Sequence, residues 1–292
     1  MKIYDVLGNS QSLDGGAMFG NAPKALWSRW YTPDPQNRIA IACRALLVDT
    51  GHQRVLLEAG IGAFFAPEMK ARYGVVEEQH VLLASLAALG FSDADIDVVI
   101  LSHLHFDHAG GVLQPYSEGR SPGLLFPNAK FVVGESAFGR AKQPHARDRA
   151  SFIPELPTLL EESGRLVCVP DSQDLIALLG PRFMFRRTNG HTPGMLHTEL
   201  VGAAHRVFFC ADLIPGRAWI HAPVTMGYDR FPEQLIDEKS ELLRRFEAEQ
   251  TWLYFTHDPA VAAARVARDA SGKFGPRQDR ASFQTGWDLD VA

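Results

Sequence analysis

The sequence predicts a single α+β domain, and three observations point to it. The chain has 292 residues, which is enough to bury a core of its own. Hydrophobic residues make up 46% and charged residues 22%, as in globular proteins and unlike disordered chains. Strand-like and helix-like segments alternate irregularly, and no linker divides them. We therefore expect residues 1–292 to form one domain.

The N-terminal residues 1–38 are expected to form an irregular arm. Residues 8–38 are rich in Gly, Pro, Asn and Ser, with Phe19, Trp27 and Trp30 between them. Such a segment packs through its aromatic side chains. Its position over a site, over a partner subunit or on its own domain stays open.

The first half of the chain then shows a hairpin, a helix and a buried strand. Ile39–Val48 and Arg54–Leu57 are β-rich segments joined by a short polar turn, which predicts a β-hairpin. Glu78–Leu89 carries leucines at helical spacing, and Gly90 stands where a helix commonly ends. Asp97–Leu101 is a short apolar run of the kind that forms a buried strand.

The second half alternates short strands with helices. The strongest helix is Pro232–Glu249, because proline suits a first helical turn and the apolar residues form one stripe. A second helix is expected at Leu156–Glu162, and a third begins in the polar, basic stretch Ser136–Arg149. Strands are expected at Lys130–Val133, Leu166–Val169, Phe183–Arg187, Arg206–Cys210 and Trp252–Phe255.

The composition also excludes several classes of protein. The formal net charge of −5 argues against a surface for nucleic acid or anionic lipid. The longest apolar run, Val81–Leu89, is far shorter than the ~20 residues that span a bilayer, and the first residues lack a secretory signal. Three cysteines in a chain of this length make no disulfide framework. We therefore expect a cytoplasmic protein.

The segment SHLHFDHAGG, Ser102–Gly111, carries the clearest chemical signal. It follows the predicted strand Asp97–Leu101 directly, and it places His103, His105, Asp107 and His108 within six residues. His103 and His105 project to the same side of an extended chain, and the two glycines that follow permit a turn. Imidazole nitrogens and carboxylate oxygens suit zinc, iron or manganese. The alternative is a surface loop that carries three histidines by chance.

Three further residues of the same types follow strands. His191 lies in GHTPGM after Phe183–Arg187, Asp212 follows the apolar run VFFC, and His257 ends the run WLYFTH. Each alone could be a turn residue or a helix cap. Together with Ser102–Gly111 they predict one metal site where the strand ends gather.

The motifs SHLHFDHAGG, GHTPGM, ADLIP and THD, in this order, resemble those of the metallo-β-lactamase superfamily from about Ile39 to His257. The resemblance implies a four-layer αββα sandwich and two divalent metal ions, with zinc expected first and iron or manganese as alternatives. It implies that His103, His105 and His191 bind one ion, that Asp107, His108 and His257 bind the other, and that Asp212 bridges both.

The sequence around these motifs, including FPNAKFVVGESAF and MGYDRFP, resembles that of the quorum-quenching lactonases and methyl parathion hydrolases. This resemblance implies that a metal-bridging hydroxide opens a lactone or ester, an N-acyl homoserine lactone among them, with Asp107 and Asp212 as catalytic residues. Dimers are frequent in that group, so a homodimer is expected. Alternatives are a phosphotriesterase, a thioesterase of the glyoxalase II type, an iron-bound oxygenase of the persulfide type and a catalytically silent metal-binding protein.

Several residues near the motifs are candidates for supporting roles. Glu58 could orient a metal ligand or be an ordinary carboxylate at a strand end. Some acyl homoserine lactonases have a Tyr close after the bridging Asp, and this chain lacks it, which leaves Tyr228 or His221 as candidate substrate contacts. Phe64, Phe65 and Phe106 could line an apolar substrate pocket or pack in the core. The basic residues 140–149 form a solvated face or a rim of the site.

Overall fold

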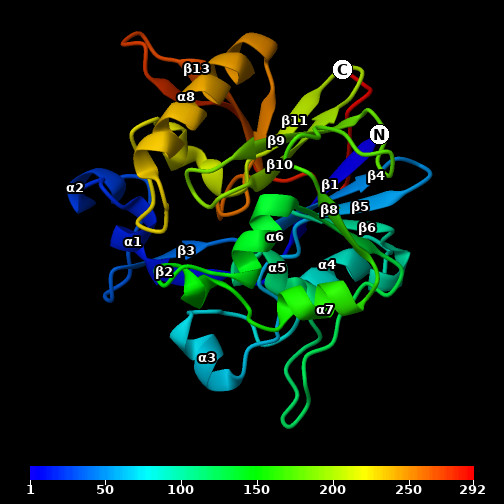
Figure 1. Cartoon of the computed structure of the whole chain (residues 1–292). Helices are drawn as coiled ribbons and strands as arrows, with labels where there is room; N and C mark the ends of the chain where they lie inside the picture. Colours follow the sequence, from blue (N-terminus) through cyan, green and yellow to red (C-terminus); the bar gives the residue numbers. More distant parts are fainter.

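Two β-sheets face each other in the computed structural model, which describes residues 1–292 (Figure 1). The first sheet has seven strands in the order β15 (Trp287–Asp288), β1 (Lys2–Leu7), β4 (Arg44–Asp49), β5 (Arg54–Leu57), β6 (Val98–Leu101), β7 (Lys130–Gly134) and β8 (Leu166–Val169). The second sheet has six strands in the order β14 (Phe274–Arg280), β13 (Ala263–Arg268), β12 (Trp252–Tyr254), β11 (Arg206–Phe209), β10 (Met195–Val201) and β9 (Phe183–Thr188). A separate pair joins β2 (Gln11–Asp14) and β3 (Arg38–Ile41).

The first sheet is apolar on both faces because it separates two hydrophobic cores. Along β6, Val98 and Ile100 pack into the core between the sheets, while Val99 and Leu101 pack into the core under the helices. Successive side chains of a strand point to opposite faces, so a strand covered on both sides must be apolar throughout. This explains the continuous apolar run at Asp97–Leu101.

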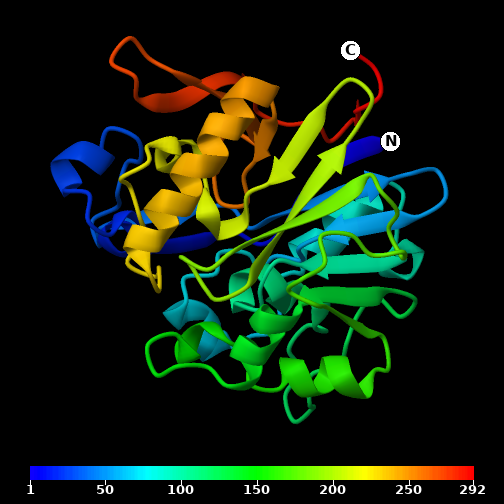
Figure 2. The ribbon, with the colours of Figure 1, turned by 45° about the horizontal axis from the view of Figure 1, so that its top comes forward.

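Helices cover the outer faces of both sheets. On the first sheet, α4 and α7 contribute leucines to the core, and on the second sheet Phe246 of α8 lies 4.6 Å from Phe208, centroid to centroid. Figure 2 shows α8 lying across the second sheet, with the helices of the first sheet on the opposite side of the molecule. The layers confirm the predicted αββα sandwich. The helices are α1 (Gly15–Phe19), α2 (Lys24–Trp27), α3 (Pro67–Arg72), α4 (Val81–Ala88), α5 (Phe106–Ala109), α6 (Glu135–Lys142), α7 (Leu156–Glu162) and α8 (Pro232–Glu249).

The predicted strand Ile39–Val48 is divided in the structure into β3 and β4. At the break, the backbone N–H groups of Ala42 and Arg44 donate to the carbonyls of His257 and Thr256, 3.2 and 3.0 Å away. Where the chain passes from the small β2–β3 pair to the first sheet, it is therefore hydrogen-bonded to the residues that follow β12. This contact also fixes the backbone of His257.

The N-terminal arm is less irregular than the sequence indicates. Lys2–Leu7 form β1, whose six residues pair with β4, so the prediction was wrong for these residues. The buried Asp5 interrupts the apolar pattern of the strand and accepts a hydrogen bond from the Phe283 N–H. Farther along, Phe19 stacks on Trp27 and on Trp219 of the same chain, at centroid distances of 5.5 and 4.5 Å.

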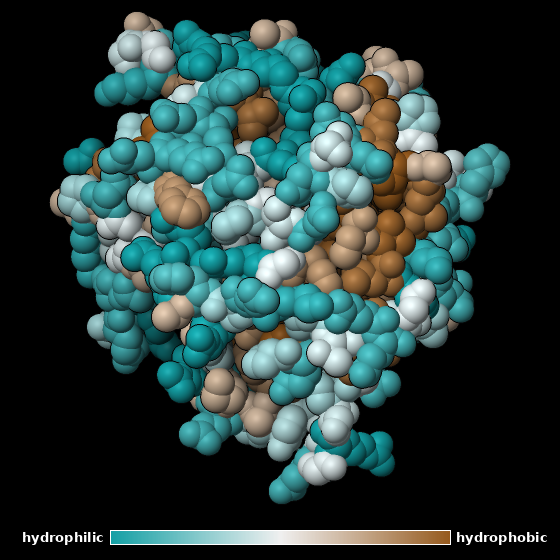
Figure 3. All heavy atoms as spheres, viewed as in Figure 1, coloured by the Kyte–Doolittle hydropathy of each residue, from teal (hydrophilic) through white to brown (hydrophobic).

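No helix of the structure combines the length and the apolar character that crossing a membrane requires. All three cysteines are unpaired. Figure 3 shows that polar side chains cover much of the viewed face and that apolar side chains gather on the side where the termini lie.

Candidate metal centre

The seven predicted ligand residues come together at one end of the sandwich. His103 and His105 lie between β6 and α5, and Asp107 and His108 lie within α5. His191 follows β9, Asp212 lies in a 3₁₀ turn after β11, and His257 follows β12. All are buried except Asp107, whose side chain is 16% exposed. The glycines behind this loop serve close packing: a Cβ at Gly111 would lie 2.0 Å from the Ala59 carbonyl oxygen.

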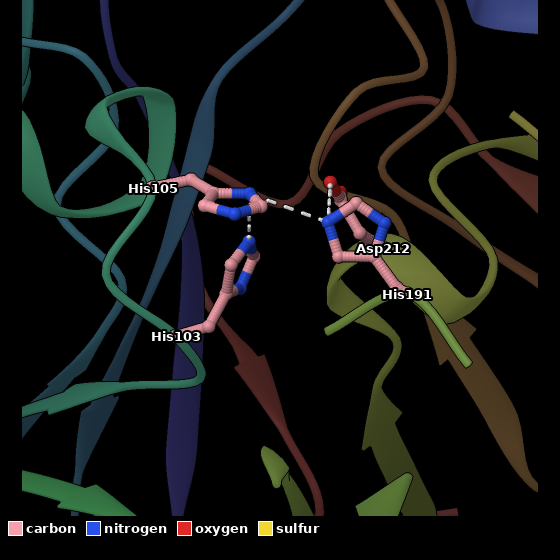
Figure 4. A group of neighbouring side chains, drawn as sticks. All are labelled: His103, His105, His191 and Asp212. Atoms are coloured by element: carbon pink, nitrogen blue, oxygen red, sulfur yellow. Dashed lines mark hydrogen bonds and ion pairs between the residues drawn. The ribbon is translucent and has the colours of Figure 1, made fainter. Parts of the chain in front are cut away.

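A first cluster joins His103, His105, His191 and Asp212 (Figure 4). His105 Nδ1 lies 3.0 Å from His103 Nε2 and 3.3 Å from His191 Nε2. Asp212 Oδ2 lies 3.2 Å from His191 Nε2. Three imidazoles and one carboxylate oxygen thus converge on a single point.

A second cluster lies on the other side of the same carboxylate. The Nε2 atoms of His108 and His257 are 3.2 Å apart, and they lie 3.2 and 3.1 Å from Asp212 Oδ1. Asp107 Oδ2 lies 3.8 Å from His108 Nε2 and 3.6 Å from His257 Nε2. Asp212 therefore offers one oxygen to each cluster.

The donor set fits divalent cations. Asp212 Oδ1 is buried and accepts no hydrogen bond, although two imidazole nitrogens lie close to it. Ligands bonded at 2.0–2.1 Å to a tetrahedral zinc ion are separated by about 3.3 Å. The nitrogen–nitrogen and nitrogen–oxygen separations of 3.0–3.3 Å around His105, His191 and Asp212 have this size. The arrangement supports a metal-binding site without showing the identity or number of ions.

The charges in the clusters favour neutral rings at His103 and His105 and an ionised Asp212. Burial lowers the pKa of His103 and His105 well below the usual value, which keeps both rings neutral as metal ligands must be. Burial alone would raise the pKa of Asp212, but His108, His191 and His257 hold it well below its usual value. Asp212 is therefore an anion between the two clusters. For His108, His191 and His257 burial alone would lower the pKa, but Asp212 raises it, so a cation would displace a proton from these rings.

The outer nitrogens of the imidazoles contact groups that fix the rings. His257 Nδ1 donates to the Ala42 carbonyl at 2.6 Å, and His103 Nδ1 lies 2.8 Å from Ser102 Oγ. His191 Nδ1 lies 2.9 Å from Asp229 Oδ1. Such contacts determine which ring nitrogen is free to bind a metal. Asp229 lies within MGYDRFP, and the sequence alone does not predict its contact with His191.

Glu58 lies behind the second cluster. Its Oε1 accepts a hydrogen bond from the Ser102 N–H at 3.0 Å, and its Oε2 lies 3.7 Å from His108 Nδ1. It is 1% exposed and has a φ of 66°, a backbone conformation uncommon for residues other than glycine. The structure thus places Glu58 where it can orient His108.

A cavity of about 200 Å³ opens onto both clusters. Tyr228 and Phe106 line it, as do Leu13 and Met18, so part of the N-terminal arm lies over this site. A larger adjoining hollow of about 710 Å³ shares Tyr73 and Phe106 with it. Phe64 and Phe65 line this hollow rather than the cavity at the clusters.

Two further expectations concern the rim. The expectation for His221 is corrected: the side chain stacks on Trp30, and this contact holds it in a separate hollow with Arg217. In the basic residues 140–149, Arg147 lines the cavity and donates to the Gly227 carbonyl at 2.9 Å. Arg147 therefore contributes to the rim of the site, whereas Arg140 and Lys142 pair with Asp148 and Glu161.

Fold and site together define a class of αββα proteins with a His/Asp metal cluster at one end of the sandwich. A family model described as the metallo-beta-lactamase superfamily matches residues 39–257. The chain belongs to the metallo-beta-lactamase superfamily, and it is a metallo-hydrolase of that superfamily.

The chain is also similar to individual members. The probable metallo-hydrolase Rv2300c of Mycobacterium tuberculosis is 27% identical over 249 residues, covering 76% of this chain and 73% of that protein. A crystal structure of a probable metal-dependent hydrolase from Staphylococcus aureus has a TM-score of 0.82 and 26% identity, covering 94% of this chain and 96% of that one. AidC, a dizinc quorum-quenching lactonase, has a TM-score of 0.75 and 21% identity over 95% of this chain and 94% of its own, which shows the fold alone.

Proposed function

We propose that the chain is a dinuclear metal-dependent hydrolase that opens a lactone or another carboxylic ester. One observation carries the proposal: the two oxygens of the Asp212 carboxylate face two different groups of imidazoles, at 3.1–3.2 Å. A carboxylate in this position can bridge two cations. His103, His105 and His191 would hold one cation with it, and Asp107, His108 and His257 the other.

The chemistry divides between the cations and the chain. When bound, divalent cations lower the pKa of water and polarise an ester carbonyl. Asp107 is the one partly exposed carboxylate of the clusters, and it borders the cavity. It can accept a proton from water as the acyl carbon gains the hydroxyl group, and deliver it to the alkoxide when the carbon–oxygen bond breaks.

The cavity walls suit a substrate with an apolar part. Phe106 borders both the clusters and the larger hollow, so an apolar substituent could extend from the reacting ester toward Phe64 and Phe65. Burial raises the pKa of Tyr228 to about 12, so its hydroxyl stays protonated and can donate to a substrate oxygen. A lactone substrate, zinc as the metal and a quorum-quenching role are consistent with the shared fold of AidC.

A panel of substrates tests the proposal. Zinc-loaded protein would be assayed on an acyl homoserine lactone, a simple ester, a phosphotriester, a thioester and a β-lactam, with Asp212→Asn as the control. We expect lactone or ester turnover that is lost with Asp212→Asn. Faster phosphotriester or thioester turnover would favour those alternatives, and no turnover by protein that holds two zinc ions would favour the catalytically silent one.

Location and assembly are part of the same proposal. We expect a cytoplasmic homodimer acting on a small molecule. Cell fractionation and sedimentation of the purified protein test both expectations, and a monomer over the whole concentration range would contradict the second.

A further inference from the structure

We infer that Asp229 is a positioning residue, whose carboxylate orients His191 and at the same time holds the segment that lines the substrate cavity. The inference rests on the proposed function, since it treats His191 as a metal ligand. Asp229 belongs to the loop before α8, 38 residues from His191 in the sequence.

The two oxygens of Asp229 contact two different groups. Oδ1 lies 2.9 Å from His191 Nδ1, and Oδ2 accepts the Met226 N–H at 2.6 Å. Asp229 is 1% exposed, so water does not compete for either contact. An ionised carboxylate only accepts hydrogen bonds, so the ring proton of His191 must be on Nδ1. The Nε2 lone pair then faces Asp212 and is free for a cation.

The backbone around Asp229 is fastened to the same loop that carries His191. Arg230 N–H donates to the His191 carbonyl at 3.1 Å, and Phe231 N–H donates to the Gly190 carbonyl at 2.8 Å. From the side of α8, the buried Lys239 donates its Nζ–H to the Val224 carbonyl at 2.6 Å. Asp229 is therefore held firmly enough to act as a fixed acceptor.

The second contact of Asp229 reaches the cavity wall. Met226 and Tyr228, on either side of Gly227, both line the cavity at the clusters. Gly227 N–H donates to the Ala17 carbonyl at 2.8 Å in the N-terminal arm. One carboxylate thus connects a ligand of the first cluster with the segment against which substrate would bind.

Asp229→Asn tests the two contacts most selectively, because asparagine has the same shape as aspartate but only one acceptor oxygen. If that oxygen accepts from His191, the amide NH₂ faces the Met226 N–H, and if it accepts from Met226, the NH₂ faces His191. The matched control is Asp5→Asn. Asp5 is also buried and also accepts from a backbone N–H, that of Phe283, but it lies in β1 and lines neither cavity.

The test compares zinc affinity by competition with a chromophoric chelator, together with kcat and KM for the best substrate of the panel. We expect Asp229→Asn to bind one of its two zinc ions 10–100-fold more weakly and to raise KM, while Asp5→Asn lowers only thermal stability. Wild-type affinity for both ions in Asp229→Asn, or an equal loss of affinity in Asp5→Asn, would overturn the inference.

A second measurement needs no variant. Nitrogen-15 NMR of the zinc-loaded wild type reports which nitrogen of His191 carries the proton, and we expect Nδ1. A proton on Nε2 would overturn the inference even if Asp229→Asn fails to fold. Failure of the proposed function is a different result: wild-type protein would bind two zinc ions and hydrolyse nothing, and the affinity comparison would still be valid.

Discussion

Glu58→Gln tests whether a buried carboxylate behind the second cluster controls its metal affinity. In the wild type, one oxygen of Glu58 accepts from Ser102 N–H and the other lies 3.7 Å from His108 Nδ1. A glutamine that keeps the Ser102 bond turns its NH₂ toward His108 Nδ1. The ring proton must then move to Nε2, the atom that faces Asp212. The opposite orientation of the amide places NH₂ against the Ser102 N–H.

In the first orientation His108 Nε2 must lose its proton before it can bind a cation, and in the second two buried N–H donors face each other; we expect a cost of about 1–3 kcal/mol in either case. The expected loss is therefore on the order of 10–100-fold in affinity for one of two cations. Chelator competition measures it, and Glu58→Asp, which keeps the charge in a residue type that tolerates positive φ, should lose less.

The matched control is Glu199→Gln. Glu199 is fully buried in β10, and its oxygens lie 3.4 and 2.9 Å from nitrogens of Arg206 and Arg245, outside both cavities. We expect this variant to melt at a lower temperature and to keep wild-type metal affinity. The reasoning is refuted if Glu58→Gln binds both cations as tightly as the wild type, or if Glu199→Gln loses as much.

Three further predictions concern stability. Burial lowers the pKa of Lys239 to about 7, so above pH 7 the amine is protonated in the unfolded chain and neutral in the folded one. The free energy of unfolding of the wild type, measured in urea titrations, should therefore rise by about 3 kcal/mol relative to that of Lys239→Met between pH 7 and pH 10. A difference between the two proteins that stays constant over this pH range would contradict the prediction. Trp219→Ala removes a side chain stacked on Phe19 and bonded to the Met18 carbonyl, so we expect about 3–5 kcal/mol lower stability by denaturation and a raised KM, since Met18 lines the cavity. Removal of metal with EDTA should lower the melting temperature, because cations bind the assembled clusters and not the unfolded chain; an unchanged melting temperature would count against the metal site.

The sequence was most informative where one local pattern decides the structure. α7, α8 and β8 have the predicted bounds, because both helices have proline in the first turn and Gly164 separates α7 from β8. β10 was not predicted. Its residues are all at least largely buried, and His197, Thr198 and Glu199 break the apolar pattern. His197 contacts Thr188 on β9, and Glu199 accepts from Arg245 on α8. Burial of polar side chains depends on contacts that lie far apart in the sequence.

The same division holds for the site. The seven candidate ligand residues could be predicted because each lies in a motif or at a strand end. Their supporting groups could not, since Ala42 acts through its carbonyl, and Asp229 acts from a loop that only the fold brings beside His191. The prediction for His221 failed for the converse reason: nine residues after Asp212 it is close in sequence, but its side chain stacks on Trp30 of the N-terminal arm and lines a different hollow.

The central claim is that Asp212 bridges two cations. Anomalous diffraction from zinc-loaded crystals, collected above and below the zinc edge, measures this directly. We expect two peaks, one on each side of the Asp212 carboxylate, the first among His103, His105 and His191 and the second among Asp107, His108 and His257. A single peak, or no peak between these side chains in protein saturated with zinc, would contradict it.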